Sequence, residues 1–159
     1  MTELNTAPQL APHERCTGCA ACCNGCPKGA IRMIPDREGF LYPQVTDGCV
    51  QCGHCTHICP VLKQREPRTE PAAFAVWNGD EDVRRSTAGG AFSALAEYVL
   101  EGGGVVFGAA LDDRLKVSHI AVKNLHDLPR LRGAKPVQSD VGESYQQARL
   151  YLDQGRQVL

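Results

Sequence analysis

The chain has 159 residues, of which 22% are charged, and its formal net charge is -1. This length suits one medium domain or two small ones. The charge lacks the basic excess typical of nucleic-acid binding, and apolar runs such as residues 104–110 are too short to span a bilayer, so we expect neither a nucleic-acid partner nor a membrane span.

Residues 1–12 predict a loose tail, because they contain Pro8 and Pro12 and few large apolar side chains. The first 15 residues also lack the basic start and apolar core of a secretory signal. A cytoplasmic setting, where thiols stay reduced, therefore fits this cysteine-rich chain best.

Eight of the nine cysteines fall into two copies of one spacing. In each copy, three cysteines are separated by two residues, and a fourth follows after three more residues and precedes a proline. The first run is Cys16, Cys19, Cys22 and Cys26, with Pro27, and the second is Cys49, Cys52, Cys55 and Cys59, with Pro60. This spacing is the bacterial ferredoxin signature and predicts iron–sulfur cubanes.

In two-cluster ferredoxins the fourth cysteine of each run ligates the other cluster. We therefore expect a first 4Fe-4S cluster on Cys16, Cys19, Cys22 and Cys59, and a second on Cys49, Cys52, Cys55 and Cys26. This crossed ligation makes residues 13–62 one ferredoxin-type α+β module that would barely fold without metal. Zinc and disulfides are the alternatives, but four-cysteine runs are poor zinc spacing and a disulfide framework would require a secretory signal.

Three further side chains near the cysteine runs have more than one interpretation. Cys23 breaks the spacing, so it is a spare small residue, an alternative ligand or a redox-sensitive thiol. His54 and His57 lie between ligands of the second run and are either solvated loop residues or groups that tune the cluster.

Residues 30–43, between the cysteine runs, predict a short hairpin whose side chains could cover the clusters. These side chains are Ile31, Met33, Phe40 and Tyr42. Residues 63–71 are charged and contain two prolines, so we interpret them as a linker.

Residues 72–159 alternate between strand-like and helix-like patterns, which predicts a partial α/β domain. We expect strands at 72–77, 105–109 and 117–122, helices at 91–100 and 144–152, and the opening of a further strand at 158–159. The glycines at 102–104 end the first of these helices.

Small residues precede the helix at 91–100: Ser86, Thr87, Ala88, Gly89 and Gly90. Backbone amides at such a helix start can hold a phosphate or a flavin pyrophosphate. Taken alone, this pattern favours an ordinary helix cap.

Several stretches resemble the coenzyme F420 hydrogenase/dehydrogenase beta-subunit family, in the family's order over residues 13–159. They are CTGCAACCNGCPKGAI, GFLYP, RRSTAGGAFSALAEYVLEGGGVVFGAAL and LRGAKPVQSDVGESYQQARLYLDQGRQVL. The resemblance implies an iron–sulfur flavoprotein that passes electrons between its clusters, FAD and a second substrate, which is F420 in archaeal members.

The same resemblance implies which residues serve the flavin: Ser86, Thr87, Gly89, Gly90 and Lys135. The chain departs from the family where STAGG replaces SSGG and where Pro136 replaces an aromatic residue. The family also continues into a further cysteine motif and domain, so we expect a truncated flavin domain and assign no catalytic residue.

The expected function is therefore oxidoreductase electron transfer between two 4Fe-4S clusters and a flavin, with F420 or another small-molecule carrier as substrate. The alternative is a non-catalytic ferredoxin-like subunit that delivers electrons to a partner oxidoreductase. Both interpretations require a redox partner.

Overall fold

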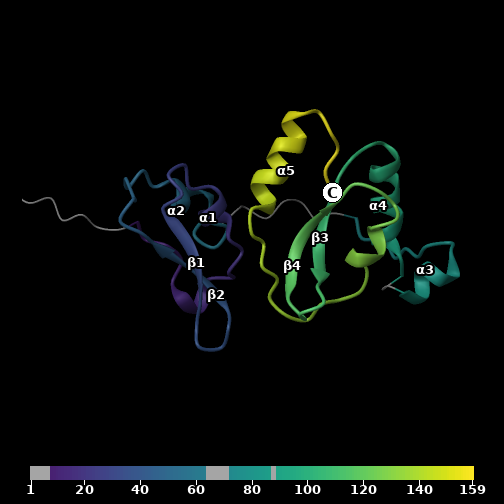
Figure 1. Cartoon of the computed structure of the whole chain (residues 1–159), viewed down its shortest axis with the longest axis horizontal. Coiled ribbons are helices and arrows are strands. Elements are labelled where there is room, and N and C mark those ends of the chain that lie inside the picture. The colour runs from purple at the N-terminus through teal and green to yellow at the C-terminus, as the bar shows by residue number, and fades with distance from the viewer. Residues whose placement is uncertain (1–7, 64–71, 87–88) are drawn as a thin grey trace, which may run out of the picture. The chain divides into compact units, whose positions relative to one another are not determined.

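The computed structural model describes residues 8–63, 72–86 and 89–159, without the side chains of residues 85 and 86. The chain divides into two compact units, Met1–Pro67 and Arg68–Leu159. Figure 1 shows the elements of each unit. The division falls within the predicted linker at 63–71, of which residues 64–71 lie outside the described residues.

The N-terminal unit is built on one β-hairpin and short helices. The elements are η1 (His13–Arg15), α1 (Ala21–Asn24), β1 (Ile31–Pro35), β2 (Leu41–Val45) and α2 (His54–Ile58). Strands β1 and β2 are antiparallel, with Ile31 opposite Val45 and Pro35 opposite Leu41. The hairpin predicted for residues 30–43 is confirmed and extends to Val45.

The two cysteine runs adopt the same backbone path. Each forms a loop with two left-handed positions and then enters a short helix, α1 or α2. The first left-handed position is Gly18 (φ 63°) in one loop and Gln51 (φ 56°) in the other. The second is Ala20 (φ 58°) and Gly53 (φ 71°). The sequence repeat is therefore a structural repeat.

The N-terminal unit has little apolar core of its own. Its described buried hydrophobic residues are Ala20, Ala30, Ile31 and Cys55. Helices α1 and α2 meet at Gly25, where a Cβ atom would overlap Ile58 Cδ1. Small residues thus bring the two cysteine-bearing helices together around space that apolar side chains do not fill.

The C-terminal unit combines helices with a second hairpin. The elements are α3 (Glu81–Ser86), α4 (Ala91–Glu101), β3 (Val106–Leu111), β4 (Val117–Val122), η2 (Leu128–Leu131) and α5 (Ser144–Asp153). Strands β3 and β4 are antiparallel, with Val106 opposite Val122. Val158 adds a parallel bridge to Val105, at the edge where the sequence predicted one more strand.

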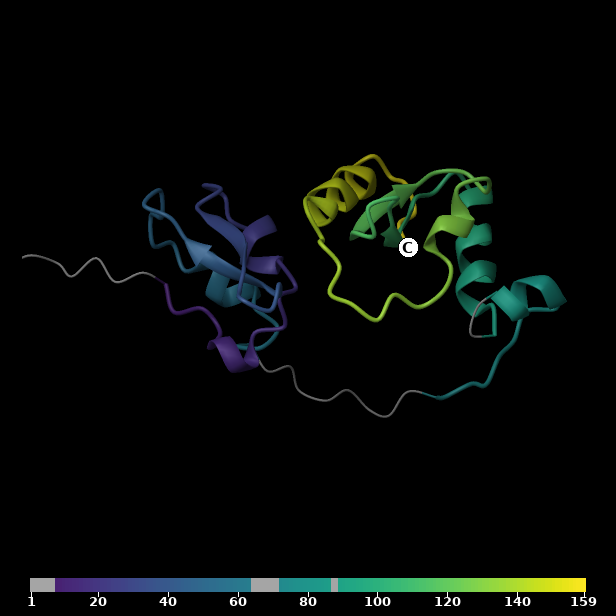
Figure 2. The ribbon, with the colours of Figure 1, turned by 60° about the horizontal axis from the view of Figure 1, so that its bottom comes forward.

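The core of this unit lies between α4, η2 and one face of the hairpin. It consists of Ala96, Leu100, Val106, Ala110, Val122, Leu128 and Leu131. Helix α5 lies on the other side of the hairpin, where Tyr151 is 6.3 Å from Phe107 between ring centroids (Figures 1 and 2).

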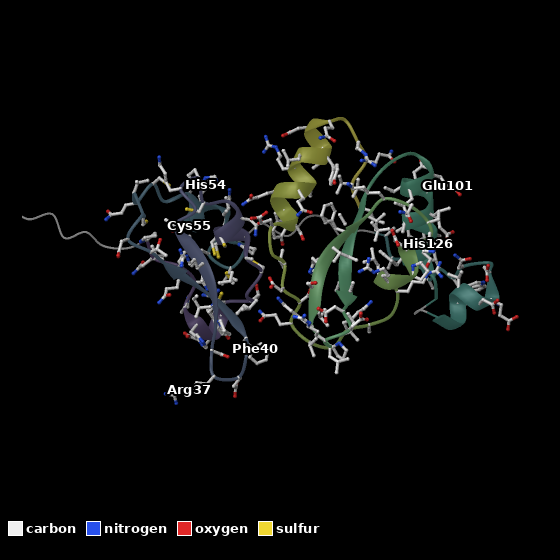
Figure 3. The ribbon with its side chains drawn as sticks, in the orientation of Figure 1. Arg37, Phe40, His54, Cys55, Glu101 and His126 are labelled. Carbon is white, nitrogen blue, oxygen red and sulfur yellow. The ribbon has the colours of Figure 1, made fainter. Side chains whose placement is uncertain are left out.

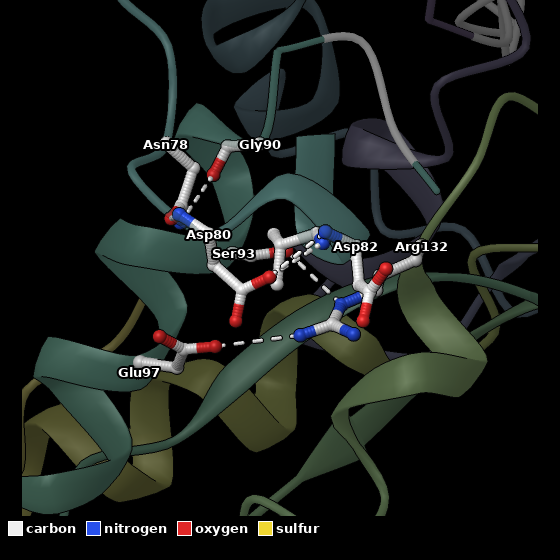
Figure 4. Close-up of polar contacts among 8 residues, drawn as sticks. Asn78, Asp80, Asp82, Gly90, Ser93, Glu97 and Arg132 are labelled. Atoms are coloured by element: carbon white, nitrogen blue, oxygen red, sulfur yellow. Dashed lines mark hydrogen bonds and ion pairs between the residues drawn. The ribbon is translucent and has the colours of Figure 1, made fainter. Parts of the chain in front are cut away.

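Arg132 ties η2 to α4. Its guanidinium donates to Ser93 Oγ over 3.0 Å and pairs with Glu97 Oε1 over 3.3 Å (Figure 4). Ser93 is 0% exposed, so this bond satisfies a fully buried hydroxyl.

One predicted strand is wrong. Residues 72–77 form no strand, and Phe74 and Trp77 are 82% and 73% exposed. The short apolar run indicated a buried strand, but none of the described strands pairs with it. Helix α3 was not predicted.

The other predicted elements are confirmed to within two residues, and β4 coincides with residues 117–122, but residues 158–159 form only the Val158–Val105 bridge and not a strand. Among the described residues of this unit there is one regular sheet, an antiparallel pair, so the predicted partial α/β domain stays a prediction. Within the described residues, no helix is long and apolar enough to cross a membrane.

Candidate iron–sulfur site

Four cysteines from both runs line one hollow in the N-terminal unit: Cys16, Cys19, Cys22 and Cys59. The rest of its wall is mainly apolar and includes Leu10, Met33, Pro43 and Val61. We call this hollow the first cavity.

The remaining four cysteines of the runs line a second hollow: Cys26, Cys49, Cys52 and Cys55. Its wall also contains Pro8, Lys28, Ile31 and Val50. We call this hollow the second cavity. Figure 3 shows the sulfur atoms, in yellow, gathered in the N-terminal unit.

Each cavity thus combines three cysteines of one run with the fourth cysteine of the other. The structure brings together the same two crossed sets that the spacing predicts. All nine cysteines are free thiols, so the disulfide alternative has no counterpart here. No three His, Cys, Asp or Glu side chains of the described residues converge on a single metal ion. A cubane does not need that convergence, because each thiolate binds a separate iron.

Burial shapes the protonation of the first cavity. It raises the pKa of the Cys22 thiol to about 11, an effect that the backbone amide of Cys23 partly offsets and that the neighbouring Cys19 and Cys16 add to. Thiols must lose their protons to bind iron. Binding of iron at Cys22 therefore displaces a proton that burial makes harder to remove.

Backbone amides reach two sulfurs of the second cavity. The Ala30 amide donates to Cys26 Sγ over 3.3 Å, and the Gln51 amide donates to Cys49 Sγ over 3.4 Å. Such bonds stabilise negative charge on a thiolate, and around a cluster they are one of the features that set its potential.

Cys23 lies outside the walls of both cavities. Its thiol donates to the carbonyl oxygen of Ile31 over 3.0 Å, which joins α1 to β1. Burial raises its pKa, with a smaller contribution from Cys26. This geometry favours a structural thiol over an alternative ligand. His54 and His57 are both exposed, as the solvated interpretation expects, but they lie in helix α2 and not in a loop.

Part of the predicted tail contacts the site. Residues 1–7 lie outside the described residues, but Pro8 lines the second cavity and Leu10 the first. Thr56 Oγ1 donates to the Gln9 carbonyl over 3.2 Å. Sequence reasoning missed these residues because no periodic pattern marks an irregular segment that packs on a site.

The four hairpin side chains that the sequence suggested as covers for the clusters lie in different places. Met33 lines the first cavity and Ile31 the second. Phe40 is 46% exposed, and Tyr42 stacks on His13 with 3.7 Å between ring centroids.

The residues proposed for a flavin lie in the C-terminal unit. Thr87 and the side chain of Ser86 lie outside the description. Gly89 and Gly90 precede α4 with φ values of 76° and 75°. Lys135 Nζ donates to carbonyl oxygens of its own loop: Arg132 at 2.6 Å, Gly133 at 3.1 Å and Arg130 at 3.4 Å. Burial lowers the pKa of Lys135.

Two cavities, each lined by four cysteines drawn from both runs, fit a ferredoxin-like 4Fe-4S module. Residues 15–63 match the family described as the 4Fe-4S dicluster domain. The N-terminal unit therefore contains a ferredoxin-like 4Fe-4S module with an electron-transfer function.

Two proteins of Methanocaldococcus jannaschii are similar to part of this chain. An uncharacterized ferredoxin is 33% identical over 51 residues, which cover 32% of this chain and 66% of that protein. An uncharacterized polyferredoxin-like protein is 33% identical over 64 residues, which cover 35% of this chain and 38% of that protein. The chain thus spans less than two thirds of either relative.

Proposed function

We propose that this chain relays single electrons through two 4Fe-4S clusters. The first cavity holds one cluster on Cys16, Cys19, Cys22 and Cys59, and the second holds the other on Cys26, Cys49, Cys52 and Cys55. The observation that carries this proposal is the division of eight cysteines into two crossed sets of four, each lining its own hollow.

The residues of the chain have definite parts in such a relay. When bound, each cluster supplies a site that gains or loses one electron without making or breaking a bond to the protein. The thiolates hold the irons, and apolar side chains such as Leu10, Met33 and Val61 exclude water from the first cavity. The amides of Ala30 and Gln51 stabilise negative charge on the sulfurs of the second.

A relay requires a donor and an acceptor. We propose a redox partner protein or subunit at one end of the relay. This interpretation makes the chain a ferredoxin-like electron-transfer subunit.

A flavin is our finer proposal for the other end of the relay. The resemblance of residues 72–159 to the beta-subunit family motivates it, and the two left-handed glycines before α4 support it, because they present backbone amides at the start of an 11-residue helix. FAD bound there would convert single electrons into the hydride transfer that F420 or another two-electron carrier needs. Lys135 would have to leave its loop carbonyls to meet the flavin.

An anaerobic reductive titration tests both levels of this proposal. The reconstituted chain without flavin should take up about two electrons, one for each cluster. After incubation with FAD and desalting, a chain that binds FAD should take up about four electrons, because the retained flavin accepts two more. An uptake of two electrons in both samples, with FAD washed off on a desalting column, would leave the relay intact and contradict the flavin.

A further inference from the structure

We infer that the two clusters are unequal, that the second has the higher reduction potential, and that Cys23 is a positioning residue for this difference. The inference rests on the proposed relay. It concerns which of the two clusters holds an added electron. No covalent bond changes when dithionite or a partner protein reduces either cluster.

Backbone amides act on sulfurs of both cavities: one in the first, where the Cys23 amide lowers the pKa of Cys22, and two in the second. The amides of Ala30 and Gln51 donate to Cys26 and Cys49, and both sulfurs belong to the second cavity. The reduced cluster carries one more negative charge than the oxidised cluster, so amide donors stabilise the reduced form and raise the potential.

The charges near the cavities act in the same direction. Lys28 lines the second cavity, and its ammonium favours the more negative reduced form. None of the described residues that line the first cavity has a lysine, arginine, aspartate or glutamate side chain. Its apolar wall disfavours added charge.

Solvent access differs in the same sense at three equivalent positions of the two loops, and in the opposite sense at a fourth, where Cys55 is buried and Cys22 is half-buried. Cys52, Gln51 and Gly53 are exposed. Their counterparts in the first run are half-buried Cys19 and buried Gly18 and Ala20. Water around a cluster stabilises its more charged reduced state, which again raises the potential of the second cluster.

Cys23 stabilises the backbone beside one of the amide donors to sulfur. Its thiol donates to the carbonyl of Ile31, the residue that follows Ala30. Because Ala30 is the donor to Cys26 Sγ, this bond fixes the backbone next to the donor. Thr56 occupies the equivalent position in the second run and instead donates to Gln9, so it is the natural control.

The first experiment assigns the two potentials. Each cluster of the full chain is titrated with dithionite and followed by EPR, in the wild type and in the matched variants Cys19→Ser and Cys52→Ser. We expect two potentials that differ by at least about 59 mV. For a one-electron couple this is a tenfold difference in the ratio of reduced to oxidised cluster. Cys52→Ser should change the higher potential, and Cys19→Ser the lower one.

A second pair of variants tests the charge without touching a ligand, in case the serine variants do not assemble. Lys28→Gln should lower the higher potential, whereas Lys63→Gln, an exposed lysine outside both cavity walls, should leave both unchanged. Equal responses to the two variants would contradict the assignment.

The third set tests Cys23. Cys23→Ala removes the donor to Ile31 and should lower only the higher potential, while Cys23→Ser retains a donor and should restore it. Thr56→Ala should leave the higher potential unchanged. A Cys23→Ala protein with eight irons and unaltered potentials would overturn the positioning role.

These outcomes separate the inference from the relay. Two clusters with equal potentials, or a higher potential that changes in Cys19→Ser alone, would overturn the inference while the relay stands. A chain that assembles no clusters would contradict the relay itself.

Discussion

Cys22 and Cys23 are neighbours in the sequence, yet their sulfur atoms have different surroundings. Cys22 lines the first cavity, whereas Cys23 lines neither cavity and donates to the Ile31 carbonyl. Spacing alone left Cys23 open as a ligand. The direction of one side chain distinguishes the two roles.

This difference predicts that alanine variants of the two cysteines bind different amounts of iron. Cys22→Ala should lose or degrade one cluster, because it removes one of four thiolates from the first cavity. Cys23→Ala should keep about eight irons per chain, the content of two 4Fe-4S clusters. Colorimetric iron and sulfide assays on anaerobically reconstituted protein measure this. Equal iron losses in the two variants would mean that Cys23 is also a ligand.

Both the backbone conformation and the close neighbours of Gly90 disfavour a side chain at this position. Its φ is +75°, and an added Cβ would lie 2.6 Å from Asn78 Cβ and 3.1 Å from Val83 Cγ1. The Asn78 side chain also donates to the Gly90 carbonyl over 3.5 Å (Figure 4). Gly155 has a similar φ of +74°, but no atom lies within 4 Å of its added Cβ.

Gly155→Ala should therefore cost about 1 kcal/mol, the usual penalty for a left-handed alanine. Gly90→Ala should cost about 2–4 kcal/mol, because overpacking adds to that penalty. Urea unfolding followed by far-UV circular dichroism gives both values. Equal costs would show that the contacts at Gly90 relax freely.

At the scale of elements, the parts that sequence predicted well are those fixed by a rule of chemistry or geometry. The ferredoxin spacing anticipated which cysteines line each cavity, because four thiolates must surround one cluster. The sequence patterns also placed β4 and α5, whose ends match the predicted ranges to within one residue.

The parts that sequence did not predict depend on long-range packing. The run at 72–77 has strand composition, but composition does not supply a partner strand, and Phe74 remains 82% exposed. Leu10 lines the first cavity although nothing local marks the tail as ordered. Lys135 looked available for a phosphate, but its ammonium binds nearby carbonyl groups.

Asp140 joins the segment that follows η2 to β4. The Asp140 carbonyl accepts from the His119 amide over 2.8 Å, and the Asp140 amide donates to the Val117 carbonyl over 3.0 Å. The Asp140 carboxylate pairs with Lys116 Nζ at 2.9 Å. The Lys116 ammonium holds the pKa of the Asp140 carboxyl below its usual value, and the same pair raises the pKa of Lys116.

This ion pair predicts a pH window. The contribution of Asp140 is present above its unfolded pKa of about 3.9 and is lost as the pH falls through its lower folded value. The contribution of Lys116 is present below its unfolded pKa of about 10.4 and is lost as the pH rises through its higher folded value.

We therefore expect Asp140→Asn to lower the unfolding midpoint of the C-terminal unit slightly near pH 7. The difference from the wild type should shrink below about pH 4 as the wild-type carboxylate protonates. Thermal unfolding at several pH values measures it. A difference that stays constant down to pH 2 would show that the carboxylate's charge has no role.

At the scale of the whole molecule, the two units have different sources of stability. The C-terminal unit has a continuous apolar core that includes Ala96, Val106, Val122 and Leu128, each at most 2% exposed. The N-terminal unit has few buried apolar side chains and two cysteine-lined hollows. Clusters would therefore take the place of a core there.

Removal of iron should consequently affect the units unequally. After anaerobic chelation, amides of β1 and β2 should exchange with solvent much faster, while those of β3 and β4 keep their protection. Hydrogen exchange with mass spectrometry compares the two hairpins in one sample, so the C-terminal hairpin is the internal control. Retained protection in β1 and β2 would mean that the N-terminal unit folds without metal.

The central claim is that the N-terminal unit holds two redox-active cubanes. Its most direct test is iron and acid-labile sulfide analysis of the anaerobically reconstituted full chain, with EPR spectra before and after dithionite reduction. The account predicts about eight irons and eight sulfides per chain, and spectra of reduced 4Fe-4S clusters that integrate to about two spins. Four irons or fewer, bound zinc in place of iron, or iron that dithionite does not reduce would contradict it.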